Sequence, residues 1–250
     1  MSAALPPLAV AIDGPAGAGK STTARAVAAR LGLRWIDTGA MYRAVTLWLL
    51  RQGIPPIEGS VLERMLSRIQ IQLVTVGKQQ RVLLCGEDVT TEIRDQEVTR
   101  QVSRVAALPQ VRQALVRWQR SMAEKGNVVV EGRDIGTVVL PDAPVKIFLV
   151  ASLEERAKRR LKDLEDCGER VDRATVQAEI RRRDDTDSSR QHSPLQPASD
   201  ALLLDTTSLS FEEQVDKIVY LIHEKGYCSD QLGCHAGEQA SGGGDETTFA

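Results

Sequence analysis

Short apolar runs alternate with longer amphipathic segments along most of the chain. The apolar runs predict buried β-strands at residues 8–12, 128–130, 145–150 and 201–204. Between them, hydrophobic residues recur at helical spacing and predict helices at residues 22–31, 111–122, 153–164, 176–183 and 211–223. Strands that alternate with helices in this way indicate an α/β protein, with a central parallel sheet and helices on both faces.

One region departs from this alternation. Two strand-like runs, 69–76 and 81–85, are joined by Gly77 and Lys78 and predict a β-hairpin. The helical residues on either side are expected to belong to the same structure. Together they predict a small inserted subdomain at residues 57–101.

The C-terminal end of the sequence differs from the rest in composition. Residues 226–250 are rich in Gly, Ser, Glu and Thr, and we expect a disordered tail. Cys228, Cys234 and His235 raise the alternative of a metal site. Their spacing fits no established zinc pattern, which favours the flexible tail.

Composition and charge exclude several classes of protein. Of the 250 residues 42% are hydrophobic, enough to bury a sizeable core, and 32 basic against 34 acidic residues give a net charge of −2. Proteins that grip nucleic-acid polymers are usually basic, and 4% aromatic residues are too few for a base-stacking surface. No apolar run approaches the length of a membrane span, and the four cysteines contain no CxxC pair. We therefore expect a cytoplasmic protein that binds neither a nucleic-acid polymer nor a membrane.

The clearest chemical motif follows the first predicted strand. The segment from Gly14 to Ser21 reads GPAGAGKS and matches GxxxxGK[ST], between a strand and a helix as this motif requires. Backbone N–H groups of such a P-loop surround phosphate oxygens, and the helix N-terminus favours negative charge. Lys20 can reach the β- and γ-phosphates of ATP, and the Ser21 hydroxyl can ligate Mg²⁺. The residues expected to bind ATP are Gly14, Pro15, Ala16, Gly17, Ala18, Gly19, Lys20, Ser21 and Thr22.

Three further segments are expected to bind a second anion beside the nucleotide. Residues 37–43 and 131–137 are expected at the carboxyl ends of strands, where open α/β sheets bind their ligands. Residues 154–190 contain 11 basic and 11 acidic residues, and nine of the basic ones are arginines. This pattern fits either a solvated, salt-bridged helical hairpin or a mobile lid that lays arginines over phosphates. The density of arginines after a P-loop favours the lid, because the guanidinium fork binds phosphate in a bidentate way.

These segments together resemble the bacterial cytidylate kinases, which have the P-loop nucleoside monophosphate kinase fold. The resemblance implies a central parallel sheet of five strands with helices on both faces, a small inserted NMP-binding subdomain and a helical lid. The resemblance covers residues 8–223 and is carried by IDGPAGAGKS, DTGAMYR, GEDVTTEIR, SRVAALPQVRQAL, EGRDIGTVVLPDAPVKIFL and RRRDDTDSSR. It implies a monomeric kinase of pyrimidine metabolism that transfers the γ-phosphoryl group of ATP to CMP or dCMP, with Mg²⁺ bound alongside ATP. It also implies three parts: a P-loop core (1–56, 102–151 and 191–225), an inserted NMP-binding subdomain (57–101) and a lid (152–190).

The resemblance also implies roles for single residues. The expected catalytic residues are Lys20, Arg133 and Arg190. The expected CMP-binding residues are Thr38, Tyr42, Arg43, Ser103, Arg112, Arg133, Asp134, Arg183, Asp187 and Arg190. Among these, Arg43, Arg133 and Arg190 should grip the acceptor phosphate; Ser103, Arg112 and Asp134 should read the base; Arg183 and Asp187 should hold the sugar. Two positions depart from the common family pattern: Thr38 stands where serine is common, and Glu131 where aspartate is common. Glu131 is still expected to orient the magnesium shell.

The chemistry of cytosine supports the role of Asp134. A carboxylate accepts well from the N4 amine of cytosine, whereas uracil presents an O4 acceptor at the same place. A wrong pairing of this kind costs about 1–3 kcal/mol, so we predict a preference for cytidine over uridine nucleotides. The alternative is that Asp134 forms only an ion pair with Arg133.

One rival function, a kinase with a hydroxyl acceptor, survives chemically from the sequence, and a second, a GTP-dependent switch, lacks its motif. A phosphate acceptor is largely dianionic at neutral pH and needs no general base. A kinase acting on a hydroxyl group needs a carboxylate to take the proton, and Asp37 could serve. A GTP-dependent switch would need a guanine-reading N/TKxD motif, which the sequence lacks.

Overall fold

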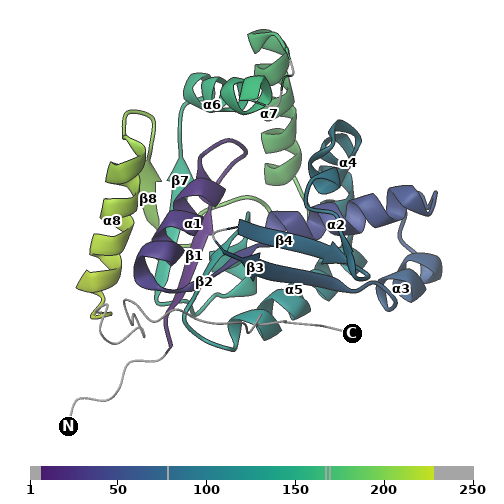
Figure 1. Cartoon of the computed structure of the whole chain (residues 1–250), viewed down its shortest axis with the longest axis horizontal. Coiled ribbons are helices and arrows are strands. Elements are labelled where there is room, and N and C mark those ends of the chain that lie inside the picture. The colour runs from purple at the N-terminus through teal and green to yellow at the C-terminus, as the bar shows by residue number, and fades with distance from the viewer. Residues whose placement is uncertain (1–6, 78, 167, 169, 228–250) are drawn as a thin grey trace. The chain divides into compact units, whose positions relative to one another are not determined.

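The computed structural model describes residues 7–77, 79–166, 168 and 170–227. These residues form two compact units (Figure 1). The first unit contains the described residues of 1–35 and 126–234, and the second contains those of 36–125. The predicted division into a core, an inserted subdomain and a lid remains a prediction about function.

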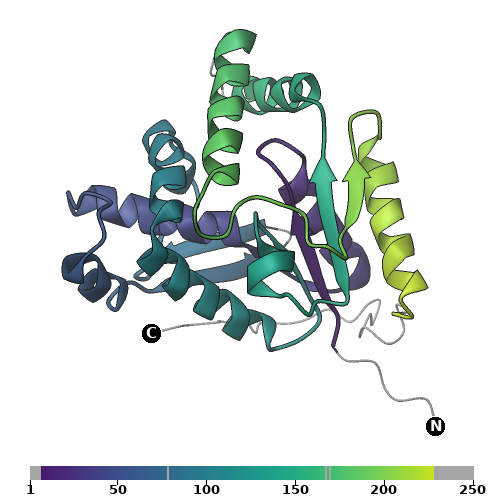
Figure 2. The same ribbon diagram turned by 180° about the vertical axis from the view of Figure 1, so that it is seen from behind.

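The first unit is built on a sheet of five strands in the order β2-β6-β1-β7-β8 (Figures 1 and 2). The strands are β1 (Ala9–Asp13), β2 (Arg34–Asp37), β6 (Val128–Glu131), β7 (Val145–Val150) and β8 (Leu202–Asp205). Because β1 pairs in parallel with both β6 and β7, and β7 with β8, the predicted parallel sheet is confirmed. β2 was not predicted, since its sequence RWID contains no continuous apolar run. The unit boundary falls within β2.

The central strands are buried at nearly every position. Val10, Ala11 and Ile12 of β1 and residues 128–130 of β6 have no solvent exposure, as expected for parallel strands covered on both faces. Helices α1 (Lys20–Leu31) and α8 (Phe211–Glu224) pack against each other and against these strands. Because β1 and β6 are parallel neighbours, the loops that follow them leave the sheet at the same edge.

Helices α6 (Leu153–Asp166) and α7 (Arg173–Ser188) follow β7 and pack against each other with crossing axes (Figure 2). They share a small apolar core of Ala157, Leu164, Val176 and Ile180. The apolar spacing predicts a helix that ends at residue 183, but α7 continues to Ser188. The arginine- and aspartate-rich segment 181–190 therefore lies mainly on the last turns of a helix.

The second unit combines helices with a small antiparallel sheet. Its helices are α2 (Thr38–Arg51), α3 (Ser60–Leu66), the short 3₁₀ helix η1 (Glu92–Arg94), α4 (Gln96–Ala107) and α5 (Pro109–Ala123). The predicted hairpin is confirmed as β3 (Ile71–Val76) and β4 (Gln79–Leu84), and the short β5 (Glu87–Asp88) adds a third strand. This unit is larger than the predicted insertion at 57–101, because α2 packs on α4 and η1, and α5 packs on α3 and α4.

The described part of the chain ends at residue 227. Tyr227 is buried among α1 and α8 side chains, so the folded part includes Gly226 and Tyr227, which the predicted boundary assigns to the tail. The remainder of that segment, with Cys228, Cys234 and His235, lies outside the described residues.

Candidate nucleotide and phosphate site

The loop between β1 and α1 has the backbone shape of a phosphate cradle. Gly14 has φ 146°, and a Cβ on it would lie 2.2 Å from the carbonyl oxygen of Leu149 in β7. Gly19, at the start of α1, has φ 88°, which is in the left-handed region. Side chains at these two positions would be strained or would clash, so the loop requires glycine there.

Lys20 is the first residue of α1, directly after this loop, and is buried. Its Nζ donates to the carbonyl oxygen of Pro15 at 2.7 Å. Burial, reinforced by the positive charge of Arg133, lowers the pKa of Lys20 to about 7, although Glu131 and Asp13 oppose the shift. A bound polyphosphate would supply negative charge beside this ammonium group and favour its protonated form.

Ser21 and Glu131 bring two oxygen-bearing side chains together. The Ser21 hydroxyl donates to Oε2 of Glu131 at 2.8 Å, and the indole N–H of Trp35 donates to Oε1 at 3.1 Å. Ser21 is exposed whereas Glu131 is buried. Hydroxyl and carboxylate oxygens suit Mg²⁺, which retains waters and substrate phosphates as its other ligands. Among the described residues there is no cluster of three His, Cys, Asp or Glu side chains that could hold a metal ion.

Asp13, the last residue of β1, anchors the loop after β6. Its Oδ1 accepts from the backbone N–H of Ile135 at 2.8 Å, and its Oδ2 from that of Gly136 at 2.7 Å. These residues begin η2 (Ile135–Val139), a π-helical turn directly after Asp134. Burial raises the pKa of Asp13 to about 6 despite the two backbone hydrogen bonds.

This shift predicts an unusual pH dependence for Asp13→Asn. The raised folded-state pKa means that ionisation of Asp13 opposes folding. As the pH rises from about 4 to about 6, the contribution of Asp13 to the free energy of unfolding of the wild-type protein therefore decreases. The asparagine variant does not titrate, although it loses one acceptor. Relative to wild type, its free energy of unfolding should therefore rise by up to about 3 kcal/mol from pH 4 to pH 7.

Urea unfolding across this pH range measures the difference. Asp142→Asn, at an exposed position of the same unit, is the matched control and should run parallel to wild type. Parallel curves for Asp13→Asn would contradict the assigned pKa.

A group of three arginines surrounds one buried aspartate. Nε of Arg133 donates to Oδ2 of Asp187 at 2.9 Å, and Nε of Arg190 donates to the Asp187 carbonyl oxygen at 3.1 Å. Burial alone would raise the pKa of Asp187, but Arg133 and Arg190 outweigh it and hold this pKa below its usual range. Burial and Arg133 together lower the pKa of Arg183, and Nε of Arg183 has no hydrogen-bond partner among the described residues. The four side chains carry a net charge of +2, which suits a phosphate dianion.

The α6–α7 helix pair is bonded to the P-loop. Arg156 of α6 donates to the carbonyl oxygen of Ala16 at 3.1 Å and forms an ion pair with Asp184 of α7. Asp184 in turn accepts from the backbone N–H of Ala16 at 3.3 Å, and Arg159 donates to the carbonyl oxygen of Ala18 at 3.3 Å. Charged residues of 154–190 thus contact the phosphate cradle as well as one another.

The remaining predicted residues lie in the second unit. Nη1 of Arg43 donates to the carbonyl oxygen of Ile93 at 3.0 Å and to the Thr99 hydroxyl at 2.8 Å. The guanidinium group of Arg112 lies 5.8 Å from the ring centre of Tyr42, in cation–π range. Thr38 begins α2 and is buried, and Ser103 is half-buried on α4. Within this unit the structure thus pairs Arg112 with Tyr42, and it fixes Arg43 to η1 and α4.

Asp37, the carboxylate considered for a hydroxyl acceptor, has a structural role. Its Oδ1 accepts from the backbone N–H of Ala40 at 3.0 Å and caps the N-terminus of α2. Residues missed by the sequence analysis are Trp35, Asp13, Arg156 and Asp184. The last two lie in the arginine-rich segment and Asp13 directly precedes the P-loop, but Trp35 belongs to no charge or spacing pattern that would have singled it out.

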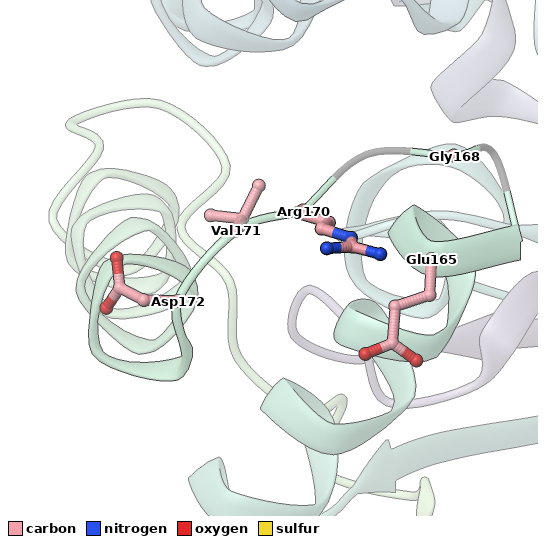
Figure 3. A pocket seen from close by; sticks show the side chains of 5 residues that line it. All are labelled: Glu165, Gly168, Arg170, Val171 and Asp172. Carbon is pink, nitrogen blue, oxygen red and sulfur yellow. The ribbon is translucent and has the colours of Figure 1, made fainter.

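A separate pocket of about 730 Å³ lies at the turn between α6 and α7 (Figure 3). Its described lining residues are Glu165, Gly168, Arg170, Val171 and Asp172. Asp172 points away from Arg170 and Glu165, and its carboxylate caps α7 by accepting from Thr175. None of the lining residues belongs to the P-loop or the arginine group, so this pocket is not part of the candidate site.

The parallel sheet, the P-loop and the adjacent arginines together define a P-loop nucleotide-binding protein. Comparison with known proteins narrows this class. The sequence profile of the family described as "Cytidylate kinase" matches residues 10–224. The chain therefore belongs to the cytidylate kinase family.

Curated relatives are similar over most of the chain. The cytidylate kinase of Bacillus velezensis is 51% identical over 218 residues, covering 87% of this chain and 97% of the relative. That of Mycobacterium leprae is 50% identical over 219 residues, with 87% and 96% coverage. A bifunctional pantoate ligase/cytidylate kinase of Synechococcus is 51% identical over 218 residues, which cover 86% of this chain and 40% of that protein. In the described residues, no helix is both long and apolar enough to cross a membrane.

Proposed function

We propose that this chain transfers the γ-phosphoryl group of ATP to CMP or dCMP, giving ADP and CDP or dCDP. One observation carries the proposal: the arginine group lies beside the P-loop in the first unit. Ser21 of the P-loop donates to Glu131, two residues before Arg133, and the backbone N–H of Ala16 donates to Asp184, the neighbour of Arg183. A kinase with a phosphate acceptor must hold two anions in line at one place, and adjacent cationic sites meet this need.

The P-loop is the proposed ATP site. The backbone of residues 14–22 would surround the phosphates, and Lys20 would neutralise charge on the transferring group. The oxygen of Ser21 is the proposed magnesium ligand, with Glu131 behind it. When bound, Mg²⁺ supplies charge neutralisation at the β- and γ-phosphate oxygens.

The proposed acceptor-binding residues of the first unit are Arg133, Asp134, Arg183, Asp187 and Arg190. For the second unit we keep the CMP-binding roles that the family resemblance implies for Thr38, Tyr42, Arg43, Ser103 and Arg112. The attacking oxygen belongs to the nucleoside monophosphate, which is largely dianionic near pH 7, so no general base is required. The arginines instead hold the acceptor and stabilise the developing charge. The α6–α7 helix pair is the proposed lid, which would exclude water from ATP when it closes. We further propose that the enzyme is a cytoplasmic monomer.

An ADP-release assay tests the function. The protein is incubated with ATP, Mg²⁺ and one acceptor from a panel of CMP, dCMP, UMP, AMP, GMP and shikimate. The proposal expects rapid turnover with CMP and dCMP, little with the purines or shikimate, and almost no ADP without an acceptor. ATP binding with no turnover of any nucleoside monophosphate would overturn it.

Asp134→Ala tests how the base is selected. Asp134 is buried, and in the proposal its carboxylate accepts from the cytosine N4 amine. Its loss should reduce the ratio of kcat/KM for CMP to that for UMP by about 10- to 150-fold. Asp142→Ala, at an exposed position in the same unit, should leave this ratio unchanged. A wild-type ratio in Asp134→Ala would rule out a role in base reading.

A further inference from the structure

Glu131 is held at both carboxylate oxygens by side chains from different elements. From α1, Ser21 donates to Oε2 at 2.8 Å. From β2, the strand next to β6 in the sheet, Trp35 donates to Oε1 at 3.1 Å. Glu131 is only 2% exposed, whereas Ser21 is exposed.

The hydrogen bond to Ser21 has a direct consequence for metal binding. A serine hydroxyl that ligates a cation must direct an oxygen lone pair toward it, so its proton must point elsewhere. The buried Oε2 of Glu131 accepts that proton and leaves the exposed side of the oxygen open to the cation. Groups of this kind, one step behind a metal ligand, orient the ligand and increase its basicity.

A glutamate needs an additional anchor to serve in this way. It has one more rotatable bond than aspartate, so a carboxylate that is fixed at only one oxygen can turn away from Ser21. The indole N–H is a donor only and belongs to a rigid ring. Trp35 also packs against the apolar core of the first unit, which fixes the direction of its N–H. Trp35 therefore compensates for the longer side chain at position 131.

We propose that Trp35 is a positioning residue of the magnesium–nucleotide site, acting through Glu131 on the Ser21 hydroxyl. Trp35 touches neither the nucleotide nor the metal in this proposal. The inference rests on the proposed function in one respect, namely that Ser21 ligates the Mg²⁺ that accompanies ATP.

The test compares ATP binding with and without Mg²⁺, by isothermal titration calorimetry in excess Mg²⁺ and in EDTA. The ratio of the two Kd values measures how much the metal contributes to binding. Trp35→Phe keeps an aromatic ring but removes the donor, and it should reduce this ratio about tenfold while metal-free ATP binds as in wild type. A purely structural role for Trp35 would weaken binding equally with and without metal, and an equal loss would overturn the proposal.

Two further variants make the test specific. Trp118→Phe makes the same change at a half-buried position of α5 and should leave the ratio at its wild-type value. Glu131→Asp shortens the side chain so that its carboxylate no longer needs the Trp35 anchor, and adding Trp35→Phe to it should therefore change the ratio less than about twofold. A full tenfold effect in the Glu131→Asp background would show that Trp35 does not act through Glu131.

A measurement that leaves Trp35 in place covers the case in which Trp35→Phe does not fold. In a Trp48→Phe/Trp118→Phe background, Trp35 is the remaining tryptophan. Adding Mg²⁺ to the ATP complex should change its emission, and identical emission with and without Mg²⁺ would overturn the proposal. None of these readouts needs an acceptor. A protein that fails to phosphorylate CMP but shows these effects would refute the proposed function alone, and one that turns over CMP without them would refute only the role of Trp35.

Discussion

Lys20→Met is expected to lower kcat/KM for phosphoryl transfer by at least about 10²- to 10³-fold, the usual cost of removing one preorganised charge-stabilising group. The same substitution should not destabilise the nucleotide-free protein. Wild-type Lys20 is buried with a pKa of about 7, below its ordinary value of 10.5, so its charge opposes folding. By linkage, the wild-type protein gains stability from this group as the pH rises from 7 toward 10.5. The methionine variant lacks this buried positive charge. Relative to wild type, it should be stabilised most at or below pH 7 and less above pH 7.

Two measurements on one variant separate catalysis from folding. Coupled ADP release gives the loss of activity, and thermal unfolding at pH 6.5 and pH 9.5 gives the change in stability. Lys217→Met, at an exposed position on α8, is the matched control and should change neither. Turnover near the wild-type rate in Lys20→Met would refute the catalytic role, and lower stability at pH 6.5 than wild type would refute the assigned pKa.

Arg190→Met is the second substitution with a large expected effect. The guanidinium group is buried beside Asp187, and its Nε donates to the Asp187 carbonyl oxygen. In the proposed mechanism it holds the acceptor phosphate and stabilises charge that develops during transfer. Its loss should reduce kcat by about 10²- to 10³-fold and also raise the KM for CMP. The KM for ATP should change much less.

The shape of the side chain at position 190 should also matter. Arg190→Lys keeps the charge but not the planar fork, so it should recover only part of the lost activity. Arg182→Met removes an arginine from the exposed face of the same segment and serves as the control, with activity near wild type. Steady-state kinetics with CMP as the varied substrate distinguishes these outcomes. If Arg182→Met and Arg190→Met were equally impaired, the buried arginine would have no special role.

Features built from consecutive residues were predictable from the sequence. The P-loop is one, because its cradle consists of neighbouring backbone N–H groups and needs only glycine, lysine and serine between a strand and a helix. The buried strands β1, β6 and β7 are others, since a strand covered on both faces must be apolar at every position. The β3–β4 hairpin followed from two strand-like runs and a short turn.

Contacts between distant residues were decided only by the tertiary structure. Three hydrogen bonds join residues that are far apart in the sequence. They connect Ser21 with Glu131, Asp13 with Gly136 and Ala16 with Asp184, which are 110, 123 and 168 residues apart. Local periodicity predicts which residues form a strand or a helix. The residue that a side chain contacts depends instead on the order of the strands and on the orientation of each helix and strand in the fold. The same limit explains why α7 runs past the predicted end at residue 183, where its charged last turns bind Arg133 and Ala16 instead of an apolar core. The sequence alone thus determined the P-loop motif, and only the folded structure showed that Trp35, Asp13 and Asp184 contact residues in and beside that loop.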